Sequence, residues 1–504
     1  MCPSRFQSDS ASTPAASAHG LVQGLGLISA TTLVMGSMIG SGIFIVSSEI
    51  ARLVDSPALL MLVWLLTGFM TLVGALSYGE LAAAMPNAGG QYVYLRESLG
   101  PLYGFLYGWT AFLVIQTGTI AAVAIAFAKY LGELVPWVSA SHWLVHFGHW
   151  GPVEFGLNTE ELVGIASILF LSWLNTRGVR WGALVQNLFT FAKIAALAGL
   201  IVLGLLVVRD AGAIAANFTH FWQGFSLRGL HSYHLDGRLV LVSTPTIVFI
   251  AMVGSLFSSD AWNNITFTAG EVKNPRRNLP LSLALGTAIV TALYLLANLA
   301  YLNALPLHGS PHAATVLGRG IQYASEDRVA TAMVSVLFGQ HGAAIMAAAI
   351  LISTFGCNNG LILAGARVYY AMARDGLFFH GVGQLNEPFR VPARALLLQA
   401  VWASLLCLSG TYNELLEYVM FAVFLFYILT IGGLFRLRRI RPDLPRPYRV
   451  IGYPWLPALY ILLAVYFDVQ LLRFKPHYSG GGLLLVLLGV PVYWLWTRRS
   501  QPAA

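Results

Sequence analysis

The sequence predicts an all-α polytopic membrane protein with about twelve transmembrane helices. Of its 504 residues, 57% are hydrophobic and only 10% are charged, so there are too few polar side chains to cover a water-soluble core. Apolar runs of about 20 residues recur along the chain between charged or Pro/Gly-rich breaks. We therefore expect the chain to reside in a lipid bilayer.

The apolar runs give the expected helices in order along the chain. They are 24–51, 57–85, 101–135, 161–177, 183–208, 239–269, 280–305, 335–374, 393–410, 413–435, 454–473 and 482–498. The third and eighth runs are longer than a bilayer requires, so each is interpreted as one tilted helix with an amphipathic extension. Residues 1–20 are rich in Ser and Ala, and we expect a short disordered cytoplasmic tail there.

The positions of Arg and Lys predict the orientation. With the N-terminus inside the cell, the even-numbered connections and the two tails hold most of the basic residues, and the densest group is the six arginines of residues 436–449. Positive-inside sorting then places both termini in the cytoplasm of a multi-pass protein of the cell membrane. The net charge of +8 follows from this bias and gives no argument for nucleic-acid binding.

Several classes of function find no support in the sequence. No Walker, Rossmann or H-E-x-x-H motif occurs, so we expect neither an enzyme nor a cofactor. His142, His146 and His149 would share one face of a helix, yet an interfacial aromatic belt is favoured there and no metal site is expected. Cys2, Cys357 and Cys407 lie in the tail or inside predicted helices, so no external disulfide is expected.

The first apolar run contains the helix-weakening sequence Gly36-Ser-Met-Ile-Gly-Ser-Gly-Ile-Phe44. Irregular backbone within a membrane persists only where protein buries it or where it lines a wet cavity. A break at Gly40 to Gly42 would free backbone amides at the positive end of a half-helix, which favours a carboxylate. The alternative is close helix packing through small residues such as Gly36 and Gly40.

The sixth run has a second polar interruption, from Gly254 to Asn264, that includes Asp260. An acidic residue at membrane depth is costly and by default suggests a functional site. Two interrupted helices five helices apart are what an inverted repeat of five helices produces. The pair therefore favours a binding site over simple packing.

This repeat predicts the organisation of the whole chain. The first repeat comprises residues 21–210, an external loop 211–238, and the second repeat 239–435. A basic cytoplasmic loop, 436–453, then leads to two further helices and the C-terminal tail in residues 454–504.

Three further features involve charged residues in or near the predicted helices. Lys193 lies inside the fifth run, where a buried ammonium requires a carboxylate or carbonyl partner unless it snorkels to the surface. Glu80, and Glu271 with Arg374 and the nearby Arg276 and Arg367, are expected on the cytoplasmic side. They are predicted either to form ion pairs of an inner gate or to be interfacial anchors.

Four segments in this order resemble the amino acid–polyamine–organocation superfamily, and most closely its L-type amino acid transporter branch with the bacterial relatives. They are GSMIGSGIF, YGELAAAMPNAGGQYVYLRESLGP, LFSSDAWNNITFTAGEVKNPRRNLP and NGLILAGARVYYAMARDGLFF. The resemblance covers roughly residues 20–440. It implies a leucine-transporter-like fold of five-plus-five inverted repeats with broken helices 1 and 6 and two added C-terminal helices, and alternating access without ATP.

The resemblance also implies substrate-binding residues. The substrate carboxylate would bind backbone amides and the Ser41 hydroxyl at the first break, and its α-amino group would bind carbonyls at the second. The residues concerned are Ile39, Gly40, Ser41, Gly42, Phe257, Ser258 and Asp260, with Asn263 flanking the second break. Phe257 matches an aromatic gate, although ordinary packing would also explain it.

Two charged residues bear on coupling and selectivity. Lys193, in FTFAKI, matches a lysine that replaces the sodium ion in sodium-independent members. Asp260 matches a position where a carboxylate occurs in members that accept cationic amino acids and in others that do not. Alternatively, Asp260 caps the following half-helix.

The resemblance implies a secondary active amino acid transporter, an exchanger or proton-coupled, with a small-molecule amino acid as substrate. A polyamine or organic-cation transporter and a non-transporting amino acid sensor are the alternatives. Animal members of the L-type branch are disulfide-linked to a heavy chain through a cysteine after the third helix. Residues 133–160 contain no cysteine, so no disulfide-linked heavy chain is expected here.

Overall fold

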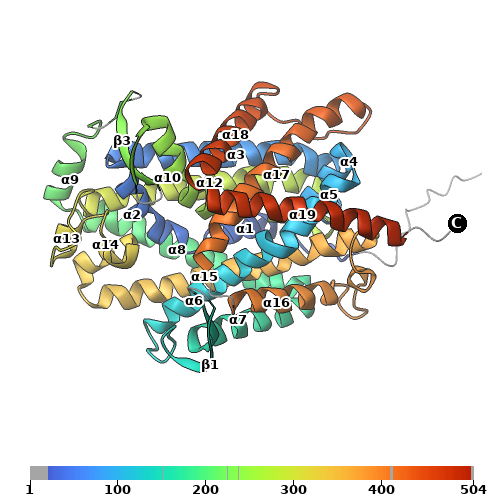
Figure 1. Cartoon of the computed structure of the whole chain (residues 1–504), viewed down its shortest axis with the longest axis horizontal. Helices are drawn as coiled ribbons and strands as arrows, with labels where there is room; N and C mark the ends of the chain where they lie inside the picture. The colour runs from blue at the N-terminus through green and yellow to red at the C-terminus, as the bar shows by residue number, and fades with distance from the viewer. Residues whose placement is uncertain are drawn as a thin grey trace, which may run out of the picture.

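The structure, a computed structural model, describes residues 21–150, 153–223, 225–226, 228–235, 238–408 and 412–500. The predicted tail 1–20 lies outside the described residues. Figure 1 shows a bundle of helices with two small β-hairpins at its periphery.

Helices α1 to α10 and both hairpins lie before the second break in the sequence. They are α1 (Leu27–Met38), α2 (Gly42–Val54), α3 (Pro57–Ala84), α4 (Gln91–Leu99), α5 (Pro101–Thr110), α6 (Gln116–Gly132), α7 (Thr159–Thr176), α8 (Val179–Val202), α9 (Ala211–Phe218) and α10 (Thr244–Ser258). π-Helical turns at Ala111–Ile115 and Leu203–Val207 continue α5 into α6 and extend α8. The hairpins are β1 (Trp143–Trp150) with β2 (Val153–Asn158), and β3 (Leu230–Leu235) with β4 (Arg238–Ser243).

The remaining helices follow the second break. They are α11 (Asn264–Phe267), α12 (Pro275–Ala304), α13 (Val316–Arg319), α14 (Val329–Phe338), α15 (His341–Arg374), α16 (Ala393–Cys407), α17 (Tyr412–Ile440), α18 (Trp455–Phe474) and α19 (Pro476–Ser500). Short 3₁₀ turns occur at Ala269–Glu271, Ser325–Asp327 and His380–Gly383.

The predicted multi-pass membrane architecture is confirmed. Among the described residues, eight helical segments are long and apolar enough to cross a membrane, and α1 with α2 forms a ninth candidate span bent by 41°. The other three predicted runs contain α7, α10 and α16, which have 18, 15 and 15 residues. Each predicted apolar run therefore contains a helix.

Two predicted boundaries and one predicted helical face were wrong. The run 335–374 is divided at Gly339, whose φ of +55° ends α14 before α15 begins. The run 239–269 starts as strand β4, and α10 begins only at Thr244. Residues 143–150 form β1, whose period of two cannot align His142, His146 and His149 as a helix would.

Both interrupted helices lie inside the bundle. α1 packs against α8, α12 and α15, while α10 packs against α2 and α3. The residues around them belong to one continuous apolar core. The polar groups of the two breaks therefore need partners within the protein or from a ligand.

Candidate substrate site

The first break separates α1 from α2 at the predicted position. α1 ends at Met38, Ile39 adopts an extended conformation, and Ser41 precedes the first residue of α2, Gly42. Gly40 and Ser41 are only partly buried, whereas their helical neighbours are mostly buried. The backbone is thus interrupted where the interior is accessible.

At this break, carbonyl groups accept hydrogen bonds from side chains, whereas two backbone amides have no acceptor among the described residues. Nζ of Lys193 donates to the Gly36 and Ile39 carbonyls at 2.9 and 2.7 Å, and the Ser353 hydroxyl donates to the Gly40 carbonyl at 2.8 Å. No described residue accepts a hydrogen bond from the Gly40 or Ser41 amide. The unpartnered groups are donors at the positive end of α2, which suits a carboxylate.

The three glycines near the first break serve different purposes. A Cβ on Gly36 would lie 2.1 Å from Gln186 and 2.2 Å from Thr190, so this glycine permits close packing of α1 on α8. A Cβ on Gly42 would lie 2.0 Å from the hydroxyl of Ser258, in the other broken helix. At Gly40 the nearest atom is Cys357 Sγ at 3.6 Å, an ordinary contact. The packing alternative therefore applies to Gly36 but does not account for Gly40.

The second break separates α10 from α11. α10 ends at Ser258, and Ala261 takes a left-handed conformation with φ of +65° before α11 begins at Asn264. The Phe257 carbonyl accepts a bond from the Asp260 amide at 3.2 Å. Since a carbonyl oxygen can accept two hydrogen bonds, the Ser258 carbonyl, which accepts one from the Tyr294 hydroxyl, retains capacity for a ligand. The Phe257 ring is partly buried against the core, and its role as a gate stays a prediction.

One tyrosine joins the two breaks. The hydroxyl of Tyr294, on α12, lies 3.2 Å from the Met38 carbonyl and 3.0 Å from the Ser258 carbonyl. Sequence reasoning missed Tyr294 because it lies within an ordinary apolar helix, where nothing distinguishes it from a packing residue.

Asp260 lines a cavity between the second break and the facing helices. Its carboxylate accepts a hydrogen bond of 2.6 Å from the hydroxyl of Tyr427 on α17. The cavity is also lined by Gln91, Tyr107, Thr119 and Asn263. α11 has no side-chain cap, so the alternative that Asp260 caps this half-helix was wrong; its side chain is bonded to α17 instead.

Asn263 connects the second break to a helix that sequence reasoning did not link with it. Its side-chain amide donates to Oε1 of Gln91 at 2.9 Å, and Gln91 in turn donates to the Thr430 hydroxyl at 3.1 Å. This chain of bonds ties α4, the second break and α17 together beside the cavity.

Lys193 is buried, with 1% of its surface exposed, so the snorkelling alternative was wrong. Besides its two bonds to the first break, Nζ donates to the Ser353 carbonyl on α15 at 2.8 Å. Three carbonyl oxygens thus surround one ammonium group, an arrangement that a bound cation would also satisfy. The predicted role of Lys193 in replacing an ion stays a prediction.

Of the residues expected at an inner gate, Glu271 and Arg367 form an ion pair with each other. Arg367 on α15 donates two hydrogen bonds, of 2.9 and 2.8 Å, to the carboxylate of Glu271, and both side chains are fully buried. The backbone of Leu25, just before α1, is bonded to Glu271 and Lys273. The pair therefore links the start of α1 and the end of the second broken helix to α15.

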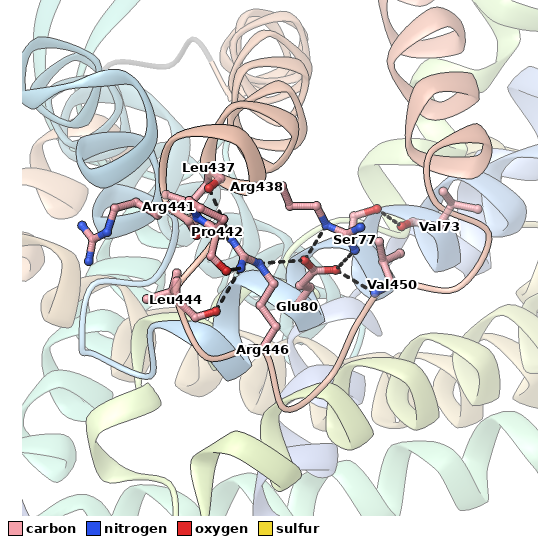
Figure 2. A network of polar contacts seen from close by, with 10 residues as sticks. All are labelled: Val73, Ser77, Glu80, Leu437, Arg438, Arg441, Pro442, Leu444, Arg446 and Val450. Atoms are coloured by element: carbon pink, nitrogen blue, oxygen red, sulfur yellow. Dashed lines mark hydrogen bonds and ion pairs between the residues drawn. The ribbon is translucent and has the colours of Figure 1, made fainter.

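Glu80 lies in a different network (Figure 2). Arg438 donates to its two carboxylate oxygens at 2.8 and 2.6 Å, and the Val450 amide donates at 2.8 Å. Arg446 approaches it at 3.5 Å. In the same loop, burial and the charge of Glu80 raise the pKa of Tyr448.

Arg374 takes part in neither network. It is exposed at the end of α15 and forms no ion pair among the described residues. Its neighbour Asp375 accepts hydrogen bonds from Arg96 and Tyr92 on α4. The prediction that Arg374 joins Glu80 or Glu271 in ion pairs was therefore wrong, because Arg367 pairs with Glu271 and Arg438 pairs with Glu80 instead.

Comparison with known proteins places this arrangement in a family. Residues 25–476 match the family model described as amino acid permease. The chain is 31% identical over 484 residues to the human large neutral amino acids transporter small subunit 2, covering 95% of this chain and 81% of that protein. It is 30% identical to the Bacillus subtilis serine/threonine exchanger SteT, with 96% and 98% covered, and 28% identical to the human b(0,+)-type amino acid transporter 1, with 94% and 88% covered. The chain belongs to the amino acid permease family.

Proposed function

We propose that this permease is a secondary active carrier of amino acids that works without sodium, by exchange or by proton-coupled uptake. The observation that carries the proposal is the ammonium group of Lys193, held by three carbonyls at the first break. A fixed positive charge there stabilises the interrupted helix as a bound cation would, so no ion has to enter for the site to form.

The two breaks divide the recognition of the substrate between them. We assign the substrate carboxylate to the free amides of Gly40 and Ser41, assisted by the Ser41 hydroxyl and the dipole of α2. The carbonyls near Phe257 and Ser258 accept bonds from the α-amino group. Substrate binding then favours closure of the breaks around it, and this differential affinity drives the exchange between outward and inward states.

The cavity beside Asp260 receives the substrate side chain. No described Lys or Arg lies within ion-pair distance of this partly buried carboxylate. An uncompensated carboxylate facing a cavity favours a cationic group there. We therefore assign Asp260, with its partner Tyr427, to the recognition of cationic side chains.

The membrane setting follows the charge distribution. We place the protein in the cell membrane with both termini in the cytoplasm, since the basic residues gather in the connections on that side. It acts without a disulfide-linked heavy chain in this proposal, because the connection after α6 contains no cysteine. The cysteines of the described residues, Cys357 and Cys407, are buried.

The relatives favour amino acid transport over the two alternatives. Their names describe transporters and an exchanger of amino acids, and the similarity extends over almost the whole chain. A polyamine carrier or a sensor that binds without transport has no such support.

Uptake by purified protein in sodium-free liposomes tests the proposal. A panel of labelled amino acids is supplied with and without unlabelled amino acid inside, and with and without an inward proton gradient. We expect uptake that depends on internal amino acid or on the proton gradient and that does not change when sodium is added. Uptake that requires sodium, or binding without accumulation, would refute the proposal.

A further inference from the structure

The connection between α17 and α18 is a folded loop of arginines rather than an extended linker. α17 ends at Ile440 and α18 begins at Trp455, and both helices are long and apolar enough to cross a membrane. Residues 441–454 therefore lie at one membrane surface. Figure 2 shows this loop wrapped around Glu80 of α3.

Two of the six arginines, Arg438 and Arg446, make contacts within the loop and with α3. Arg438 pairs with Glu80 and stacks over the Tyr453 ring, 3.6 Å from its centroid. Arg446 donates to the Leu444 and Arg441 carbonyls at 2.9 and 2.8 Å, among others of its own loop. The loop backbone is thus held in one shape from within.

The other four arginines of the group are directed outward. Arg436, Arg439, Arg441 and Arg449 are exposed, and none forms an ion pair with a carboxylate among the described residues. In Figure 2 the guanidinium group of Arg441 points away from Glu80. The only acidic residue within 436–449 is Asp443, so this surface has a clear excess of positive charge.

Large apolar side chains flank these arginines. Ile451 and Trp455 are 65% and 80% exposed, and Ile440 is 50% exposed. Tryptophan prefers the boundary between headgroups and acyl chains, where its ring is apolar and its N–H is hydrated. A soluble polyanion would gain little from these side chains, whereas a phospholipid can contact both the charges and the apolar flank.

We propose that Arg436, Arg439, Arg441 and Arg449 form a binding surface for the headgroups of anionic phospholipids. Guanidinium groups suit phosphate oxygens because they present several donors in one plane. The internal bonds of Arg438 and Arg446 hold the loop in the binding shape before lipid arrives, so little order is lost on binding. Bound lipid in turn stabilises the packing of this loop on α3.

The test uses the full-length protein purified in a neutral detergent. Phosphatidylglycerol, phosphatidylcholine or inorganic phosphate is titrated in, while the thermal unfolding midpoint is followed and retained lipids are counted by native mass spectrometry. The patch variant is R439Q/R441Q/R449Q. The matched control, R177Q/R180Q/R394Q, removes three exposed arginines from other connections.

We expect phosphatidylglycerol, and neither phosphatidylcholine nor phosphate, to raise the midpoint of the wild type. The patch variant should need on the order of 100-fold more phosphatidylglycerol, since each of its three basic residues near an anionic surface contributes about a fivefold factor. The control should respond as the wild type does. Equal responses of patch variant and control would overturn the proposal.

A titration with inorganic phosphate and a single variant, R441Q, test the proposal further. If inorganic phosphate reproduces the shift, the surface is a free-anion site and the lipid proposal fails. If the triple variant does not fold, R441Q alone is used, because the Arg441 side chain makes no contact with the Glu80 network. It should weaken the response to phosphatidylglycerol several-fold, and an unchanged response would refute the proposal.

Discussion

At the residue scale, the ammonium group of buried Lys193 donates hydrogen bonds to three backbone carbonyls. Replacing Lys193 with Ala removes the charged donor from the carbonyls of Gly36, Ile39 and Ser353, although the Ser353 hydroxyl still lies 3.1 Å from the Ile39 carbonyl. Each unsatisfied buried group costs about 1–3 kcal/mol. We expect K193A to lower the initial rate of sodium-free uptake by at least about tenfold and to lower the unfolding temperature.

Lys273 supplies the matched control, since it is exposed in the connection before α12. K273A should retain the wild-type rate and stability in the same liposome assay. K193A transporting at the wild-type rate without sodium would show that the lysine has no part in the cycle.

Asp260 and Tyr427 lead to a prediction about selectivity. D260N keeps the size of the side chain but removes its charge, so a cationic substrate loses a charge-assisted hydrogen bond of about 1.5–3 kcal/mol. We expect D260N to reduce arginine uptake by at least about tenfold relative to uptake of a neutral amino acid. Competition assays with both substrates on one preparation measure this ratio.

Y427F separates the charge from its hydrogen bond. It removes the 2.6 Å bond but leaves the carboxylate in the cavity, so arginine should still be preferred. An unchanged ratio of arginine to neutral uptake in D260N would exclude charge recognition by Asp260.

At the scale of elements, substitutions of two glycines at the first break, Gly42 and Gly40, distinguish a role in packing from a role in ligand binding. G42A places a methyl group against Ser258 of the other broken helix and should destabilise the fold. G40A meets only Cys357 Sγ at 3.6 Å and should fold normally. Its methyl group projects where we place the substrate carboxylate, so we expect a KM increase of several-fold with little change in unfolding temperature.

Thermal unfolding and uptake kinetics measured on both variants check this pair. If G40A behaves as the wild type in uptake, the substrate does not bind at this break. A destabilised G40A would instead indicate that packing, and not recognition, explains the glycine.

The breaks could be predicted from sequence because they violate a simple rule. Gly40 and Gly42 weaken a helix where lipid penalises free backbone groups, and Asp260 places a charge at membrane depth. Partners from distant elements could not be predicted: Tyr294, Tyr427 and Gln91 lie in unremarkable helical sequence. The strand β1 was also missed, because its aromatic and histidine-rich residues satisfy a helical pattern as well as an extended one.

At the scale of the whole molecule, we propose that the two buried acidic residues Glu80 and Glu271 have different roles, the first as an anchor and the second as part of a gate. Glu80 holds the loop after α17 on α3, which also packs against α17 and α18. Glu271 and Arg367 instead join the segment after the second break to α15, and we propose that this pair closes the route by which substrate leaves. Only the second pair has to separate during the cycle we propose.

Labelling of a buried cysteine tests this division. Cys357 lies beside Gly40 at the first break and is buried, so a thiol reagent reaches it only when the path opens. In a background with Cys2 and Cys407 replaced by Ser, E271Q weakens the pair with Arg367. We expect E271Q to raise the labelling rate of Cys357 by N-ethylmaleimide at least about fivefold, since losing half of a buried ion pair costs about 3–5 kcal/mol.

E80Q serves as the control, because it breaks an equally close ion pair on the same side. It should lower the unfolding temperature yet leave the labelling rate near that of the wild type. Since general loosening of the fold would raise labelling in both variants, only a difference between them identifies a gate. Equal labelling rates in E271Q and E80Q would therefore show that the Glu271–Arg367 pair is structural and that the path is closed by other contacts.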